Sequence, residues 1–270
     1  MNRLIRPLSF FICCLVLVAC ATSPTGRRQL MLVSEESSIA SSKTAYLSTV
    51  KELDNAGRLE DNWVINKRVN VITGLLITEA IKLRPETAGW EWSVVVIDDP
   101  KMVNAWCMAG GRMAIYTGLI KQIDPTDDEL AQVMAHEISH ALAKHPAEKM
   151  SRQMTTTVGV AAVGIASDNT GVALSGAALT AMLAVNLPNS RAAEKEADRM
   201  GIELAAKAGF DPAAAATLWK KMSAVSKSGT PQFLSTHPAP SNRQQELAQL
   251  EPEMRKYYDP DGKHVIYKLD

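Results

Sequence analysis

Apolar side chains recur every three or four positions over residues 61–83, which is the spacing of one buried helix face. We therefore expect a helix over this range. Another helix is expected over residues 34–54, because Ser34 is a favourable capping residue and two glutamates follow it in the first turn. Residues 34–83 are thus predicted to be largely helical.

Two stretches after these helices have the composition of β-strands. Residues 90–97 are rich in aromatic and β-branched side chains, and residues 104–116 form an extended stretch that Gly110 and Gly111 interrupt. We expect a small, mostly antiparallel sheet from these segments. The stretch over residues 111–116 is expected to be an edge strand, to which an extended peptide can pair by strand addition.

The second half of the chain predicts a series of helices. Thr126 and Glu129 fit a capping box, and the helix that they begin is expected to run from Asp127 to about His145. Residues rich in Ala, Gly and Val then predict a pair of apolar helices, for which a hairpin dipping into a membrane is the alternative. The apolar pair is expected over 158–187, further helices over 191–208, 212–225 and 241–250, and a loop over 227–240.

These elements predict an α+β fold. Residues 35–255 are expected to form one mainly helical domain, in which the small sheet lies beside the helix that begins at Asp127. Residues 256–270 are expected to be a C-terminal tail. Formal net charge is zero, which gives no support for a nucleic-acid partner. Only Cys107 of the four cysteines lies in the body of the chain, so no disulfide joins two body cysteines.

The N-terminus has the pattern of a secretion signal. Two arginines precede an apolar run that is too short for a comfortable membrane span. The run ends at Cys20 in a sequence that resembles the bacterial lipoprotein box, in which the cysteine is lipidated. We expect residues 1–19 to be a signal peptide and residues 20–34 to be a tether. An uncleaved anchor helix, or cleavage that leaves Cys20 free, is the alternative.

Resemblance to Gram-negative lipoproteins also implies a location in the cell. Ala21, not aspartate, follows the cysteine. In such lipoproteins this favours the outer membrane, with the protein facing the periplasm. The expected location is therefore the bacterial cell envelope, with the protein held at the membrane by its N-terminal lipid.

The H-E-x-x-H motif at His136 predicts a metal site. His136 and His140 are four residues apart in the expected helix, so both imidazoles project from one face. Their nitrogens can therefore bind a single zinc ion at about 2.0 Å each. Glu137 lies about 100° round the helix, where it can serve as the general base toward a water on the metal. Two hydrogen-bonded histidines on an amphipathic helix are the alternative.

A later acidic segment supplies the next candidates. Glu194 and Asp198 are four residues apart and share a helix face. We expect Glu194 to be the third ligand and Asp198 to orient a ligand histidine, with a solvated face paired to arginines as the alternative. His145 follows His136 by nine residues, about 180° round a continuous helix, and is expected to face away from the metal.

The two motifs together resemble the M48 family of zinc metallopeptidases. The H-E-x-x-H motif is followed by Arg191-Ala-Ala-Glu194-Lys-Glu-Ala-Asp198, as in that family. Further matching residues are Asn104-Ala105, Gly110-Gly111, Gly118-Leu119, His237-Pro238 and Arg243, although many members have proline where this chain has Ala109. The resemblance covers about residues 50–250. It implies a zincin-type catalytic domain with one Zn²⁺ per chain.

The resemblance also implies roles for residues outside the two motifs. His237 either stabilises the oxyanion of the reaction or enters the fourth zinc position in a latent state, with a loop histidine that caps a helix as the alternative. Arg243 either supports the loop that carries His237 or binds substrate, with a surface charge on the last helix as the alternative. Candidates for contact with a substrate peptide are Asn104, Gly111, Arg112, Met113 and Arg243.

The function implied is that of a zinc-dependent endopeptidase. Its substrates would be misfolded or misassembled cell-envelope proteins, with Glu137 activating a zinc-bound water. Its partners would be these polypeptides and the outer-membrane assembly machinery. The alternative is an envelope chaperone or assembly factor with a latent zinc site that His237 gates. A structural zinc protein would need a closed site of four ligands, which His237 alone could complete.

Overall fold

The structure is a computed structural model. It describes residues 20–166, 172–225, 232–237 and 242–269, and for Cys20 and residues 158–189 it describes the backbone alone. The signal peptide expected over residues 1–19 lies outside the described residues. Lipidation of Cys20 stays a prediction, as does the core packing expected for the apolar helices of residues 158–187.

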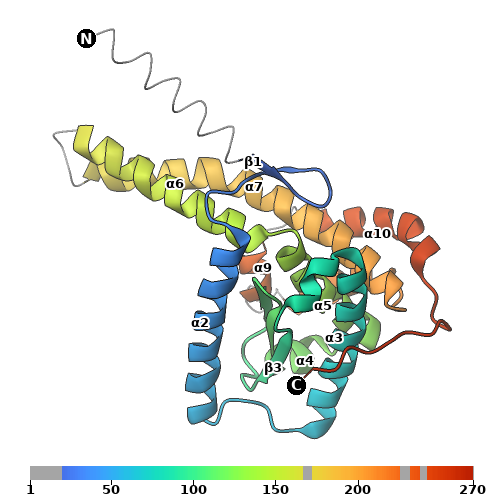
Figure 1. The fold of residues 1–270 in the computed structure, drawn as a ribbon. Helices are drawn as coiled ribbons and strands as arrows, with labels where there is room; N and C mark the ends of the chain where they lie inside the picture. The colour runs from blue at the N-terminus through green and yellow to red at the C-terminus, as the bar shows by residue number, and fades with distance from the viewer. Residues whose placement is uncertain (1–19, 167–171, 226–231, 238–241, 270) are drawn as a thin grey trace.

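The described part of the chain is mainly helical with two small sheets (Figure 1), which confirms the α+β class. The strands are β1 (Cys20–Thr22), β2 (Arg28–Leu30), β3 (Ser93–Ile97), β4 (Ala105–Met108) and β5 (Arg112–Tyr116). The α-helices are α2 (Glu35–Asn55), α3 (Trp63–Leu83), α4 (Thr117–Ile123), α5 (Asp127–Leu142), α6 (His145–Ala166), α7 (Val172–Lys207), α8 (Ala214–Val225), α9 (Gln232–Thr236) and α10 (Arg243–Met254). Two short 3₁₀ helices are η1 (Pro85–Gly89) and η3 (Arg255–Tyr257).

Side-chain caps fix the starts of the helices that carry the fold. Ser34 accepts a hydrogen bond from the backbone of α2, and Asn62 does the same for α3. Thr126 and Glu129 form both hydrogen bonds of a capping box at the start of α5, at 3.2 and 2.9 Å. Each cap satisfies backbone N–H groups that the first helical turn leaves without a partner. The capping box expected from the sequence is confirmed.

The order of the three-stranded sheet corrects two expectations. The order is β3-β5-β4, with β3 parallel and β4 antiparallel to β5, so the sheet is not mostly antiparallel. The strand expected at an edge, β5, lies in the centre, and β4 is an edge instead. Gly110 and Gly111, both with positive φ, turn the chain from β4 into β5. Four of the five residues of β5 are buried, as a central strand requires.

The segment expected to be a tether is a hairpin docked on the body. Strands β1 and β2 pair antiparallel, and we call residues 20–30 the N-terminal hairpin. Gln29 donates a hydrogen bond to the backbone carbonyl of Ala143 at 2.7 Å, and Arg27 forms an ion pair with Glu148 at 2.5 Å. The polar side chains of this segment predict a linker. In the structure they instead bind polar groups of segments that are distant in the sequence.

The C-terminal segment also contacts the body. The backbone N–H of Tyr267 donates to the carbonyl of Gly74 in α3 at 3.1 Å. A Cβ atom on Gly74 would lie 2.5 Å from the carbonyl oxygen of Tyr267, so this close approach needs glycine. The expected tail therefore packs along α3.

The helices after α5 differ from expectation in their limits. Helix α5 ends at Leu142 and not near His145, because Lys144 adopts a left-handed conformation with φ of 59°. Helix α7 unites the expected second apolar helix with the helix expected over 191–208. A short helix, α9, lies within the expected loop, and α10 follows Asn242 and extends to Met254. The cap expected at Ser241 lies outside the described residues.

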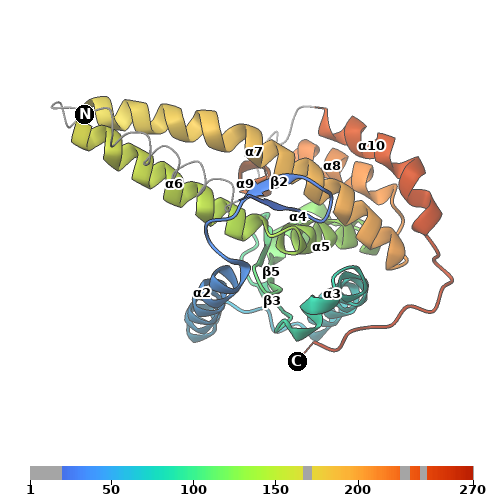
Figure 2. The same cartoon turned by 45° about the horizontal axis from the view of Figure 1, so that its top comes forward.

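Helices α6 and α7 pack against each other and extend beyond the rest of the molecule (Figures 1 and 2). The hydrophobic core lies at the other end of this pair. Among the residues that the structure describes, no helix is both long and apolar enough to cross a membrane.

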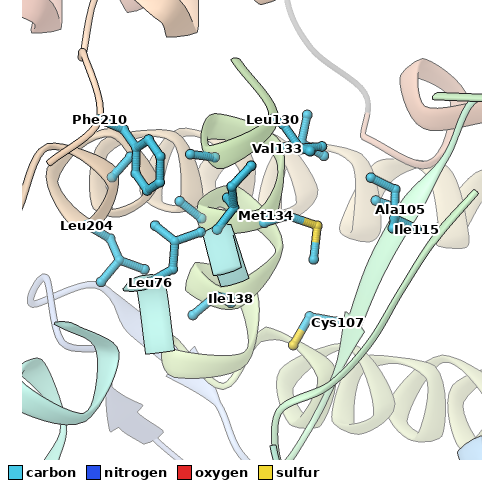
Figure 3. Packing of buried hydrophobic residues seen from close by; sticks show 14 of the residues in the cluster. Leu76, Ala105, Cys107, Ile115, Leu130, Val133, Met134, Ile138, Leu204 and Phe210 are labelled. Atoms are coloured by element: carbon cyan, nitrogen blue, oxygen red, sulfur yellow. The ribbon is translucent and has the colours of Figure 1, made fainter. Parts of the chain in front are cut away.

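Helix α5 lies at the centre of the core. Its residues Leu130, Met134 and Ile138 are fully buried, and Figure 3 shows them within the cluster that also holds Leu76 and Leu204. Burial of α5 on several sides holds it rigidly, because close-packed interiors leave little room for displacement.

A glycine sets the distance between α5 and α7. A Cβ atom on Gly201 of α7 would lie 3.0 Å from the backbone Cα and N of His136 in α5. The absence of a side chain therefore lets the two helices approach closely. This contact brings the carboxylates of α7 opposite the histidines of α5.

Candidate metal centre

Four side chains from three segments converge at one end of this helix contact. His136 and His140 project from α5, Glu194 from α7, and His237 follows α9. One ligand atom from each of the four lies within 4.8 Å of the others. Three of the four residues are buried, and His140 is intermediate. The structure thus brings together the three expected ligands and His237.

The separations within this cluster fit a tetrahedral zinc ion. Ligand atoms about 2.0–2.1 Å from zinc lie about 3.3 Å apart at tetrahedral angles. Nε2 of His136 lies 3.0 Å from Nε2 of His140 and 3.3 Å from Glu194. Nε2 of His140 lies 3.5 Å from Glu194, and Nδ1 of His237 lies 3.3 Å from Nε2 of His136. Imidazole and carboxylate are also donors that zinc prefers, so His136, His140 and Glu194 would hold the ion.

Glu137 lies next to the cluster with its carboxylate buried. Its Oε1 atom is 3.2 Å from Nε2 of His237. Burial raises the pKa of Glu137, although positive charge at His237 and His136 opposes the rise. A carboxylate whose pKa is raised toward neutrality is a better proton acceptor and donor in catalysis at neutral pH. The position expected for the general base is therefore occupied by a group with suitable chemistry.

Asp198 supports His136 from the side opposite the cluster. Its Oδ1 atom lies 3.0 Å from Nδ1 of His136, which leaves Nε2 directed at the cluster. Burial lowers the pKa of His136, but hydrogen bonds with Asp198 and Glu194 outweigh burial and raise it to about 9. The two carboxylates thus favour a positive charge at His136, whether a proton or a metal ion carries it.

Arg243 lies behind this pair and not in a cavity open to substrate. It is buried, forms an ion pair with Asp198 at 2.5 Å and contacts Glu194 at 3.4 Å. Its guanidinium stacks 3.9 Å above the ring of Trp219. Arg243 is therefore a buried partner of Asp198 and Glu194, and the two roles expected for it, support of the loop that carries His237 and contact with substrate, stay predictions.

His145 contradicts the expectation that it faces away from the metal. It is buried, and its Nδ1 lies 2.8 Å from Nδ1 of His140. Projection round a continuous helix fails here, because the chain turns at Lys144 and a new helix begins at His145. The signal available in the sequence was Pro146, which is favoured at the start of a helix and disfavoured in its interior.

A cavity of about 710 Å³ adjoins the cluster. Glu137, His140 and Glu194 form one part of its wall, and Cys107 and Met108 of the edge strand β4 form another. The remaining walls come from α2, α6, α7 and α9, and many of their side chains are small or apolar. A peptide segment in this cavity would lie between β4 and the cluster.

Three residues expected to contact substrate lie elsewhere. Gly111 leaves room for the ring of Trp92, since a Cβ atom would lie 2.4 Å from that ring. Arg112 pairs with Glu91, and Met113 is fully buried. They lie at or in the central strand, away from the edge where a peptide would pair.

Asn104 differs from the other candidates for substrate contact. It directly precedes β4. Its Oδ1 atom is buried, without a hydrogen-bond partner among the described residues. It is the candidate that stands next to the edge strand.

The fold and the site define a zincin-type metallopeptidase: a buried helix with H-E-x-x-H, and a carboxylate ligand from a later helix. The model of Peptidase family M48 matches residues 66–251, and the chain belongs to this family. Zinc is the cofactor of these peptidases, and the residues of the cluster at His136 form a group able to hold a metal ion.

Similar proteins fall in two groups. The chain is 31% identical over 193 residues to the mitochondrial metalloendopeptidase OMA1 of Arabidopsis thaliana, covering 71% of this chain and 37% of that protein. It is 31% identical over 244 residues to the mitochondrial metalloendopeptidase OMA1 of Bos taurus, covering 86% and 46%. The match to the beta-barrel assembly-enhancing protease of Escherichia coli K12 is 34% identical over 154 residues, covering 52% and 31%. The chain spans less than half the length of each of these relatives.

Proposed function

We propose that this protein is a zinc-dependent endopeptidase of the bacterial cell envelope. One observation carries the proposal: His136, His140 and Glu194 converge within bonding reach of one ion, and the buried Glu137 stands beside them at the wall of a cavity. Three protein ligands leave one position of a tetrahedral zinc for chemistry, as in catalytic and not structural sites.

The chain supplies the proton transfers that peptide hydrolysis needs. When bound, zinc would act as a Lewis acid toward the substrate carbonyl and make water a stronger nucleophile. Glu137 accepts the proton of the attacking water on its carboxylate and delivers it to the leaving amine. Asp198 holds His136 in the tautomer with Nδ1 protonated, so that Nε2 stays available as a ligand.

Strand addition at β4 is the proposed mode of substrate binding. The backbone N–H of Tyr116 donates to Asn104, so by the alternation of an antiparallel pair Ala105 and Cys107 direct their backbone groups away from β5. The backbone of Cys107 opposes the rise in the pKa of Glu137, which supports an orientation of this backbone toward that carboxylate. An extended peptide on this edge would lie beside the general base, and its backbone would be recognised with little regard to sequence.

The proposed substrates are misfolded or misassembled envelope proteins, with outer-membrane assembly as a setting. The lipoprotein box at Cys20 supports this address, and so does similarity to proteases named for β-barrel assembly. The relatives named OMA1 are mitochondrial, so the envelope address depends on the N-terminal sequence. An N-terminal lipid would hold the protein at the outer membrane, facing the periplasm.

A second candidate is a chaperone or assembly factor whose zinc site is latent. The observation that favours it is the position of His237, whose Nδ1 lies 3.2 Å from Glu194 and 3.3 Å from His136. These separations are those of a fourth zinc ligand. With His237 bound, no position would be left for substrate or water.

The test is metal analysis paired with a casein cleavage assay on the purified chain beginning at Cys20. We expect stoichiometric zinc in wild type and in Glu137→Gln, with cleavage by the variant lower by about 10²- to 10⁴-fold. Glu253→Gln, which alters an exposed carboxylate that is not part of the cluster, is the matched control. A wild type that binds zinc but cleaves no faster than Glu137→Gln would favour the chaperone. In that case Glu137→Gln should also leave envelope phenotypes unchanged.

A further inference from the structure

The two histidines of the H-E-x-x-H motif are supported in different ways. Nδ1 of His136 contacts the carboxylate of Asp198 directly, at 3.0 Å. Nδ1 of His140 instead contacts another imidazole, Nδ1 of His145, at 2.8 Å. His145 in turn places its Nε2 atom 3.1 Å from Oε2 of Glu196. His140 thus reaches a carboxylate through an intervening ring.

We call the chain of contacts from His140 through His145 to Glu196 the relay. Zinc binding fixes where the protons of this relay must lie. Nε2 of His140 faces the cluster and would give its lone pair to zinc, so Nδ1 must carry the proton. This N–H can donate only if Nδ1 of His145 accepts. The proton of a neutral His145 then lies on Nε2, from which it donates to Glu196. A single arrangement of protons on the two neutral rings therefore satisfies both hydrogen bonds.

The N-terminal hairpin holds the end of the relay. Nε of Arg27 donates to Oε2 of Glu196 at 2.6 Å, and the hydroxyl of Thr25 donates to Oε1. Arg27 also pairs with Glu148 at 2.5 Å, so its position does not depend on Glu196 alone. Both carboxylate oxygens of Glu196 are thus engaged, Oε2 with Arg27 and His145 and Oε1 with Thr25.

We propose that His145 is a positioning residue for the zinc ligand His140, and that Arg27 of the N-terminal hairpin completes the support through Glu196. The inference rests on the zinc site of the proposed function but not on peptidase activity. Arg27 is seven residues after Cys20. The segment that follows the expected lipid therefore also stabilises the metal centre.

Three substitutions test the ring contact. His145→Phe keeps an aromatic ring and removes both nitrogens, whereas His145→Asn keeps an oxygen that can accept from Nδ1 of His140. His264→Phe is the matched control, because His264 is a half-buried histidine of the C-terminal segment whose Nε2 contacts the backbone carbonyl of Asp259 and which belongs to no part of the cluster. Zinc affinity is measured on the full chain by competition with a chromophoric chelator. We expect His145→Phe to weaken binding by about 10- to 100-fold, His145→Asn to recover part of the loss, and the control to match wild type.

A second pair of variants tests the hairpin. Arg27→Met removes both ion pairs, and Arg199→Met removes an exposed ion pair of α7 as its control. We expect Arg27→Met to weaken zinc binding by less than His145→Phe, because the contact between His140 and His145 persists. The thermal unfolding of each metal-free variant shows whether a loss of affinity is a loss of folding. If metal-free His145→Phe does not fold, His145→Asn and Arg27→Met decide the question.

The outcomes separate this inference from the proposed function. A wild type without zinc affinity would refute the zinc site and the inference together. Zinc affinity that is unchanged in His145→Phe and Arg27→Met would overturn the inference and leave the peptidase proposal intact. Equal losses in His145→Phe and His145→Asn would overturn the role of His145 as an acceptor. A loss of zinc affinity in His145→Phe that is partly recovered in His145→Asn supports this role. Packing alone would predict the opposite order, because phenylalanine keeps an aromatic ring and asparagine does not.

Discussion

The imidazole of His237 contacts both the proposed general base, Glu137, and a proposed zinc ligand, Glu194. Its Nε2 atom lies 3.2 Å from Glu137, and its Nδ1 atom lies 3.2 Å from Glu194. One ring thus fills the space between the residue that would accept a proton and the position that a fourth zinc ligand would take. The short helix α9 and stacking on Phe233, with centroids 4.5 Å apart, hold the ring in place.

Replacing His237 should therefore release the site. We expect His237→Ala to increase casein cleavage, because the fourth position becomes open, and to weaken zinc binding by about tenfold. Cleavage rate and zinc content are measured together, with His264→Ala as the control. If cleavage instead falls by about 10²- to 10³-fold, the ring acts as an oxyanion stabiliser, and a latent state has no support.

The buried pair of Asp198 and Arg243 predicts a large effect on stability. Removing Asp198 leaves a buried guanidinium with longer contacts of 3.4 Å to Glu194 and to His136 and with its stack on Trp219. We expect Asp198→Ala to lower the free energy of unfolding of the metal-free protein by about 3–5 kcal/mol, measured by urea denaturation. Glu253→Ala, from an exposed pair, should cost about 0–1 kcal/mol. The double variant Asp198→Ala with Arg243→Met should recover part of the loss; strict additivity would show that the two side chains are not coupled.

Local chemistry was predictable from the sequence, and long-range pairing was not. The capping box at Thr126 and the spacing of His136 and His140 depend on one helical turn, which the sequence specifies. Glu194 was predicted as a ligand from its spacing to Asp198 and the presence of the H-E-x-x-H motif. The physical cause of its approach, the close contact at Gly201 between α5 and α7, has no local signal.

The errors have the same origin. His145 was placed wrongly because a single left-handed residue, Lys144, redirects the chain. The N-terminal segment was predicted to be a tether because its own composition is polar. The partners of Arg27 lie 121 and 169 residues away in the sequence, so no local pattern indicates that the segment docks. The composition of β5 predicts a strand but does not specify which neighbours it pairs with, so its central position required the structure.

Gly111 predicts a steric effect that can be separated from a backbone effect. Gly111 has φ of 80°, and an added Cβ atom would lie 2.4 Å from the ring of Trp92. Gly57 has φ of 62° with nothing within 4 Å of such an atom. We expect Gly111→Ala to cost about 1–3 kcal/mol more than Gly57→Ala in urea denaturation, because overpacking adds to the backbone strain that both share. Equal costs would mean that the Trp92 ring moves aside freely.

Glu129 predicts how stability depends on pH. Burial opposes its charge, but Lys221, at 2.6 Å, and the backbone of Thr126 outweigh burial and lower its pKa. A lowered folded-state pKa stabilises the protein above the unfolded value of 4.5, and this contribution is lost as pH falls through the folded value. Glu129→Gln keeps the capping box, since glutamine also serves there, and removes the charge alone. The gap in unfolding free energy between wild type and Glu129→Gln, measured in urea on metal-free protein, should therefore be largest at neutral pH and shrink in acid. Lys221→Met should reproduce this trend, whereas a gap independent of pH would mean that shape and not charge sets the contribution of Glu129.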